Sequence, residues 1–240
     1  MAGPRTLRTF CQLLSYPSEQ TMEASELLYI ILQAELPEAA SEIARFGKFI
    51  EQSQRWELEE AFTAVFEVNP ACALEIGWHL FGEDYERGMM LVRLREELRK
   101  YGLTEQTELP DHLTHVLPLI SAMPEERARR FVQACVLPAV ALMRQAFERN
   151  DNPYGAVIRA LAVVLQSVWG DGRPLPDGSN FLRADGQAIP EGVDLLHAFP
   201  AADAPVELCG GCHGGCGHDQ GGPPLVQLAT PVAKQEEAYQ

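Results

Sequence analysis

The sequence predicts an all-α protein: a single globular domain of about eight or nine helices, followed by an irregular tail rich in glycine and proline. Two observations lead to this fold class. Apolar residues recur at steps of three and four through the first 169 residues, which is the helical period. No stretch combines alternation of period two with turn signals, so no sheet is expected.

Four helices are expected in the first third of the chain, over residues 5–14, 22–34, 39–52 and 57–66. The next, over 85–101, has Leu91, Leu94 and Leu98 on an apolar side. Charged residues fill its other side, and Gly102 is a natural stop.

Three helices are expected in the remainder of the domain. One begins at Pro110, because the missing N–H of proline has no partner at a first helical position. Another covers 125–147 with a kink at Pro138. The last runs from Pro153 to Trp169 and is apolar on almost every face, which predicts a central, buried helix.

Glycine and proline divide the chain into two unlike regions. Residues 1–169 hold 16 of these residues, whereas 170–240 hold 20. The second density is typical of irregular or disordered segments. We therefore expect a helical domain at 1–169 and an irregular, partly disordered tail at 170–240.

Composition restricts the classes of partner and location. A formal net charge of −15 argues against nucleic-acid binding; it suits a basic partner, or serves solubility alone. No secretory signal is visible at the start. The longest apolar run, 156–165, is far shorter than the roughly 20 residues of a membrane span. We expect a cytoplasmic protein without membrane insertion, whose six cysteines are thiols or metal ligands.

A first candidate site lies in residues 78–88. Trp78 and Phe81 precede a glycine, and Glu83 and Asp84 open the next helix. Such rings can hold apolar side chains of a peptide, and such carboxylates can hold its arginines. The alternative is that the rings belong to the core and the acids cap the helix, and spacing alone favours that alternative.

Four segments together resemble the NarJ/TorD family of molybdoenzyme chaperones, most closely its nitrate reductase delta-subunit (NarJ) branch. The resemblance covers roughly residues 5–165. The segments are Leu14-Ser15-Tyr16-Pro17, Phe62-Thr63-Ala64-Val65-Phe66, His79 to Gly88 and Glu108-Leu109-Pro110-Asp111-His112-Leu113.

The resemblance implies an all-helical chaperone without catalytic activity. Its partner would be the N-terminal region of a molybdoenzyme catalytic (alpha) subunit, that of a respiratory nitrate reductase, held for molybdenum cofactor insertion before membrane attachment. Molybdenum cofactor biosynthesis proteins are further candidate partners. The resemblance and the local sequence together place the peptide site at His79, Glu83, Asp84, Tyr85, Arg87, Asp111, His112 and Val116.

Asp111 and His112 are the residues expected to contribute most to that site. Asp111 would lie in the first turn of its helix, where the helix dipole favours negative charge. We expect both side chains on the rim of a groove, with Leu113 and Val116 packing beside them. Histidine changes charge near neutrality, so it would make peptide binding sensitive to pH.

A second candidate site lies in the tail. Three thiols and two imidazoles fall within ten residues and can supply four ligands to zinc or an iron–sulfur cluster. They are Cys209, Cys212, His213, Cys216 and His218. The alternative is a flexible tail with spare cysteines, and no cofactor is expected to bind tightly in the helical domain.

Three functions therefore compete. The first is a chaperone with a peptide groove. The second is a metal-binding or redox-active protein that uses the cluster at 209–218. The third is a structural subunit retained in the mature enzyme.

Overall fold

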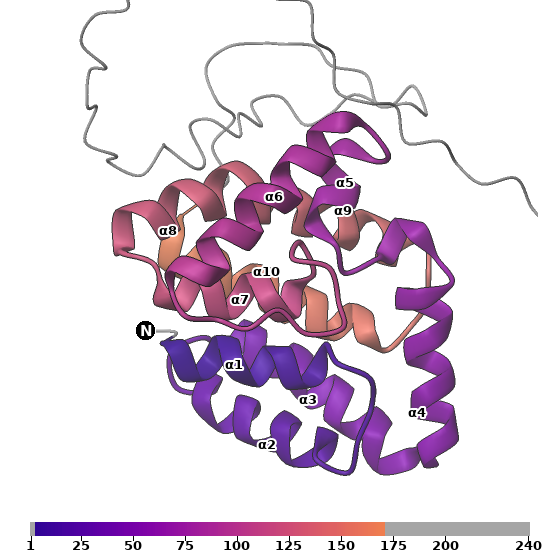
Figure 1. Ribbon diagram of the computed structural model, residues 1–240. Coiled ribbons are helices and arrows are strands. Elements are labelled where there is room, and N and C mark those ends of the chain that lie inside the picture. The colour runs from indigo at the N-terminus through magenta and orange to yellow at the C-terminus, as the bar shows by residue number, and fades with distance from the viewer. Residues whose placement is uncertain (1–2, 171–240) are drawn as a thin grey trace, which may run out of the picture. The chain divides into compact units, whose positions relative to one another are not determined.

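The helices of the body are arranged around one long central helix. The structure is a computed structural model that describes residues 3–170, and within that range it contains helices and no strand (Figure 1). The α-helices are α1 (Pro4–Leu13), α2 (Thr21–Leu32), α3 (Pro37–Gln52), α4 (Arg55–Phe62), α5 (Ile76–Phe81), α6 (Tyr85–Lys100), α7 (Leu113–Ala122), α8 (Glu125–Phe131), α9 (Leu137–Glu148) and α10 (Tyr154–Trp169). Three short turns of other helical type are η1 (Thr63–Glu67), η2 (Pro70–Cys72) and η3 (Val132–Val136).

The central helix is α10, as its apolar sequence predicts. Its residues Val157, Leu161 and Leu165 are fully buried. It packs against α3 and α9, and α1 and α2 complete the layer around α3 (Figure 1). The helix ends at Trp169, where Gly170 takes a positive φ of 77° that a residue with a side chain rarely adopts.

Two of the expected helices contain a wider turn. The helix expected over 57–66 becomes α4 followed by the π-helical turn η1, and that expected over 125–147 becomes α8, the π-helical turn η3 and α9. Pro138 lies at the second position of α9 and has no N–H for the carbonyl four residues earlier. A π-helical turn is a known way to accommodate such an interruption.

The helix predicted to begin at Pro110 begins later. α7 starts at Leu113, with His112 as its N-cap, so the prediction that Asp111 lies in a first helical turn is wrong. Pro110 and Asp111 instead form a turn closed by the bond from His112 N–H to Leu109 O (3.0 Å), and His112 pairs with Glu75 in an isolated antiparallel bridge. Ile76 N–H donates to Asp111 O (2.9 Å), and Leu113 N–H donates to Leu74 O (3.0 Å). This tertiary pairing satisfies backbone groups that a longer helix would have to satisfy otherwise.

α6 is amphipathic, but only one of its two apolar rows is buried. Met90, Leu94 and Leu98 face the core, whereas Tyr85 and Val92 are exposed. Steps of three and four give α6 two possible apolar faces, and the neighbouring helices decide which one is covered. Among the described residues, no helix is both long enough and apolar enough to span a membrane.

Candidate functional site

A groove of about 690 Å³ opens where four separate stretches of the chain meet. They are the residues that follow α1 (14–16), the α4–η1 junction (62–67), the stretch from η2 into α5 (70–78) and the loop before α7 (106–114); Arg87 of α6 completes the lining. The segments at 14–17, 62–66 and 108–113, which resemble the NarJ/TorD family, each contribute residues to the groove lining. The fourth such segment, at 79–88, contributes Arg87. Segments far apart in sequence therefore form one surface.

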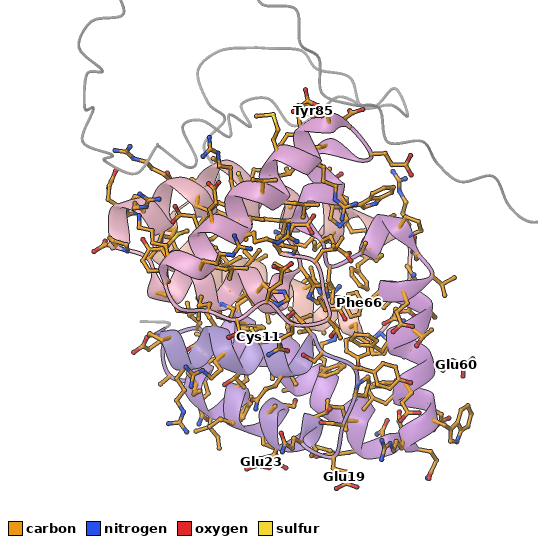
Figure 2. All side chains as sticks on the ribbon, viewed as in Figure 1. Cys11, Glu19, Glu23, Glu60, Phe66 and Tyr85 are labelled. Atoms are coloured by element: carbon orange, nitrogen blue, oxygen red, sulfur yellow. The ribbon has the colours of Figure 1, made fainter. Side chains whose placement is uncertain are left out.

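One wall of the groove is aromatic. The ring of Tyr16 meets Phe62 edge to face with centroids 5.6 Å apart, and Phe62 meets Phe66 in the same way at 5.0 Å. Behind them lies the fully buried ring of Tyr154, 5.4 Å from Phe62. Figure 2 shows Phe66 in this region of the body. Because Tyr16 is 52% exposed in front of this interlocked cluster, a ligand can reach it without opening the core.

Arg87, on the groove lining, forms an ion pair with Asp111, which is buried beneath the groove. Arg87 Nε donates to Asp111 Oδ2 (3.1 Å), and the Arg87 guanidinium lies over the Trp78 ring, 5.6 Å from its centroid. Trp78 Nε1 in turn donates to Pro70 O (2.9 Å). Burial raises the pKa of the Asp111 carboxyl, and the charge and hydrogen bond of Arg87 oppose that rise. The aromatic face and the carboxylate together fix the direction of the arginine side chain.

Gly77 makes this arrangement possible. A Cβ at position 77 would lie 2.6 Å from Asp111 Oδ2 and 3.3 Å from Arg87 Cγ. The backbone N–H of Gly77 also stabilises the ionised Asp111 carboxylate and lowers its pKa. A residue with a side chain would push the carboxylate away from Arg87.

Carboxylates outnumber cations along the groove. Glu67, Glu75 and Glu108 line it, and Arg87 is the one lysine or arginine among its described lining residues. Burial raises the pKa of Glu75, and the nearby carboxylates of Asp111 and Glu108 raise it further. This surface favours basic groups on a ligand.

His112 lines the groove as a neutral imidazole. Its Nδ1 caps α7 by accepting the Thr114 N–H (3.2 Å). The same Nδ1 lies 2.6 Å from Thr114 Oγ1. Burial, together with the charge of His115, lowers the pKa of His112 to about 4. The expectation that His112 changes charge near neutrality is therefore wrong.

Three of the predicted peptide-site residues lie at or directly beneath the groove. Arg87 and His112 line the groove, while Asp111 lies beneath it with no exposed surface, so its predicted position on a rim is wrong. Val116, also predicted for the peptide site, is fully buried with Leu113 and does not line the groove.

The remaining predicted residues lie outside the groove lining. His79 is buried, with Nε2 2.7 Å from Ala73 O, and lines a separate hollow with Arg149 and Asn150. Glu83, Asp84 and Tyr85 form the α5–α6 corner. Figure 2 shows Tyr85 projecting from that end of the body, away from Phe66.

Several lining residues were not among the predicted site residues. Tyr16, Phe62 and Phe66 lie in the resembling segments, and that membership was the available signal. Trp78 belongs to the candidate site predicted at 78–88, whereas Glu75 becomes a site residue only because residues 111–113 pair with 74–76.

The cysteines of the body are protected thiols. Cys72 and Cys135 are fully buried, and burial raises the pKa of the Cys11 thiol to about 12 and that of Cys72 to about 11. Within residues 3–170, no group of three or more His, Cys, Asp or Glu side chains is placed to hold a metal ion. The predicted cluster of Cys209, Cys212, His213, Cys216 and His218 lies outside the described residues.

Comparison with known proteins identifies the family. A sequence model described as nitrate reductase delta subunit matches residues 32–159, which is more than half of the chain. The chain belongs to the nitrate reductase delta subunit family. The predicted NarJ-type family is thus confirmed.

Two relatives in this family come from Escherichia coli strain K12. NarW, named as a probable nitrate reductase molybdenum cofactor assembly chaperone, is 25% identical over 156 residues, which are 65% of either chain. NarJ, named as a nitrate reductase molybdenum cofactor assembly chaperone, is 23% identical over 154 residues, 62% of this chain and 65% of NarJ. The chain thus spans 65% of the length of these relatives, less than two thirds.

A solved structure shows the same fold. It is the crystal structure of an Archaeoglobus fulgidus protein described as a redox enzyme maturation protein. The two chains are 22% identical and superpose with a TM-score of 0.50, covering 68% of this chain and 93% of the other. The all-α class predicted from the sequence is confirmed.

Proposed function

We propose that this member of the delta subunit family is a non-catalytic cytoplasmic chaperone for the assembly of a molybdoenzyme. It binds the N-terminal peptide of the catalytic subunit of a nitrate reductase and holds that subunit for molybdenum cofactor insertion before membrane attachment. The observation that carries the proposal is the convergence of four sequence segments on one groove. The names of the NarJ and NarW relatives support the choice of client.

The chemistry of the groove suits an amphipathic, basic peptide. A client helix can lay its apolar face against Tyr16, Phe62 and Phe66, as helices do in other hydrophobic grooves. Glu67, Glu75 and Glu108 then attract basic side chains and speed the encounter. These interactions require no bond to be made or broken in the client.

Calorimetric titration with a synthetic peptide of the client N-terminus tests this proposal. Tyr16→Ala removes an exposed ring of the aromatic wall and should weaken binding by about 10-fold, the loss expected of an aromatic contact residue. Glu108→Gln should weaken binding less, and its effect should shrink at high salt.

Tyr29→Ala is the matched control. Tyr29 of α2 is also an exposed tyrosine (40%), but it does not line the groove. Its removal should leave the affinity unchanged. If Tyr16→Ala binds as tightly as the unaltered chain, the groove is not the peptide site; if the unaltered chain does not bind the peptide at all, the proposed function is wrong.

A further inference from the structure

We propose that Arg87 donates hydrogen bonds to main-chain carbonyl oxygens of the client peptide, and that Asp111 contributes to binding only by positioning Arg87. This inference rests on the proposed function. It assigns different roles to two residues that the sequence alone placed together at a rim.

Asp111 has no surface through which to touch a ligand. Its side chain is fully buried, and Oδ2 is committed to Arg87 Nε. Gly77 closes over that oxygen, and the backbone of 110–113 is held by hydrogen bonds to Leu74 and Ile76. A buried carboxylate that meets a partly exposed arginine is placed to orient that arginine.

Arg87 has N–H donors that its bond to Asp111 does not use. A guanidinium carries five N–H groups, and the bond to Asp111 uses only the one on Nε. Across the described residues, Nη1 and Nη2 of Arg87 have no hydrogen-bond partner. The side chain keeps 18% of its surface exposed, lines the groove, and is fixed from one face by Trp78. A donor held in advance loses little conformational freedom when a ligand arrives.

The negative charge around Arg87 determines which kind of acceptor its N–H groups can bind. A client carboxylate at Arg87 would gain one attraction but would meet repulsion from Glu75 and Glu108, which lie on the same groove. A main-chain carbonyl carries no net charge and avoids that repulsion. The carbonyls at the C-terminal end of a helix are suited best, because they lack intrahelical partners.

A double-mutant cycle tests the positioning role of Asp111. In calorimetry with the client N-terminal peptide, Arg87→Ala should weaken binding by about 10- to 100-fold, as expected for hydrogen bonds to a charged group. Asp111→Asn keeps the shape of the side chain and should weaken binding less. The double variant should bind like Arg87→Ala alone, whereas losses that multiply would show that Asp111 acts independently and would overturn its assigned role.

A second measurement separates a contact with the peptide from a merely structural role. Peptides in which one amide at a time is replaced by an ester carry a weaker carbonyl acceptor at that position. At least one such replacement should weaken binding to the unaltered chain by about 3- to 10-fold and have no effect on binding to Arg87→Ala. Arg87→Lys keeps the charge but not the fork of donors, and should lose most of this coupling.

The remaining outcomes distinguish the two proposals. Ester effects that are equal in both proteins, or a carboxylate-to-alanine change in the peptide whose cost depends on Arg87, would overturn the assignment to main-chain carbonyls. Equal affinity of the unaltered chain and Arg87→Ala would overturn the role of Arg87 alone. Absence of binding to the unaltered chain would overturn the proposed function itself.

Discussion

The pair formed by Arg87 and Asp111 shows how a single residue without a side chain can decide the geometry of a site. A fully buried carboxylate is costly unless a cation and further donors compensate it. Arg87 and the backbone N–H of Gly77 supply part of that compensation, while Asp111 Oδ1 has no hydrogen-bond partner among the described residues; the missing Cβ of Gly77 supplies the room.

Gly77→Ala should therefore lower the free energy of unfolding, by about 1–3 kcal/mol, because the new Cβ overlaps Asp111 Oδ2. Gly88→Ala is the matched control: it lies in α6, and a Cβ there meets nothing within 4 Å. It should raise stability by about 0.5–1 kcal/mol, since alanine is the better helix former. Urea unfolding of both variants measures the difference, and equal effects would contradict the close approach at position 77.

His112 gives the fold a dependence on pH. Its folded pKa of about 4 lies below the ordinary value of 6.5, so the unfolded chain binds the proton first as the pH falls. The stability that His112 contributes is complete above about pH 6.5 and is lost toward pH 4. The raised pKa values of Asp111 and Glu75 act in the opposite direction, because they favour protonation of the folded chain.

His112→Asn isolates this contribution, because asparagine can still cap α7 but does not titrate. Between pH 7 and pH 4.5, the unaltered chain should lose roughly 2 kcal/mol more stability than the variant. Urea unfolding at the two pH values measures both losses. A variant whose stability falls as steeply as that of the unaltered chain would show that His112 is not the group responsible.

At the scale of elements, α6 shows why periodicity alone leaves a choice open. Met89 and Met90 are neighbours of the same type, yet Met89 is 41% exposed and Met90 is fully buried. Met90→Ala should cost about 2–5 kcal/mol of unfolding free energy, because it leaves a cavity in the core. Met89→Ala should cost no more than about 0.5 kcal/mol, as is usual for surface changes. Chemical denaturation of the two variants compares them directly, and similar costs would reverse the assigned face of α6.

The start of α7 likewise depends on tertiary contacts that the local sequence does not show. The residue types at 110–112 suit a helix start, and His112 does cap the helix. Asp111, His112 and Leu113 also enter a tertiary pairing with residues 74–76, which no local preference reveals.

For the molecule as a whole, a metal site in the tail would support the competing function of a metal-binding or redox-active protein. The prediction of a metal site at Cys209, Cys212, His213, Cys216 and His218 concerns residues outside the described part. Purified full-length protein should then contain about one equivalent of zinc or one iron–sulfur cluster, measured by elemental analysis, and Cys212→Ser should lose it. If Cys212→Ser also abolishes peptide binding, the tail takes part in the function proposed for the groove; if metal is absent from the unaltered protein, the tail cluster is not a metal site.

The amino-acid sequence alone predicts the all-α class, the central place of α10 and the four segments that resemble the family. These follow from local periodicity, from glycine and proline, and from short motifs that can be read along the chain. Only the tertiary structure decided that Tyr16, Phe66 and Trp78 share one groove, that Arg87 faces it, and that Asp111 lies beneath it. The physical reason is that burial and proximity depend on how distant segments pair, and the bonds from Ile76 to Asp111 and from Leu113 to Leu74 join residues more than thirty positions apart.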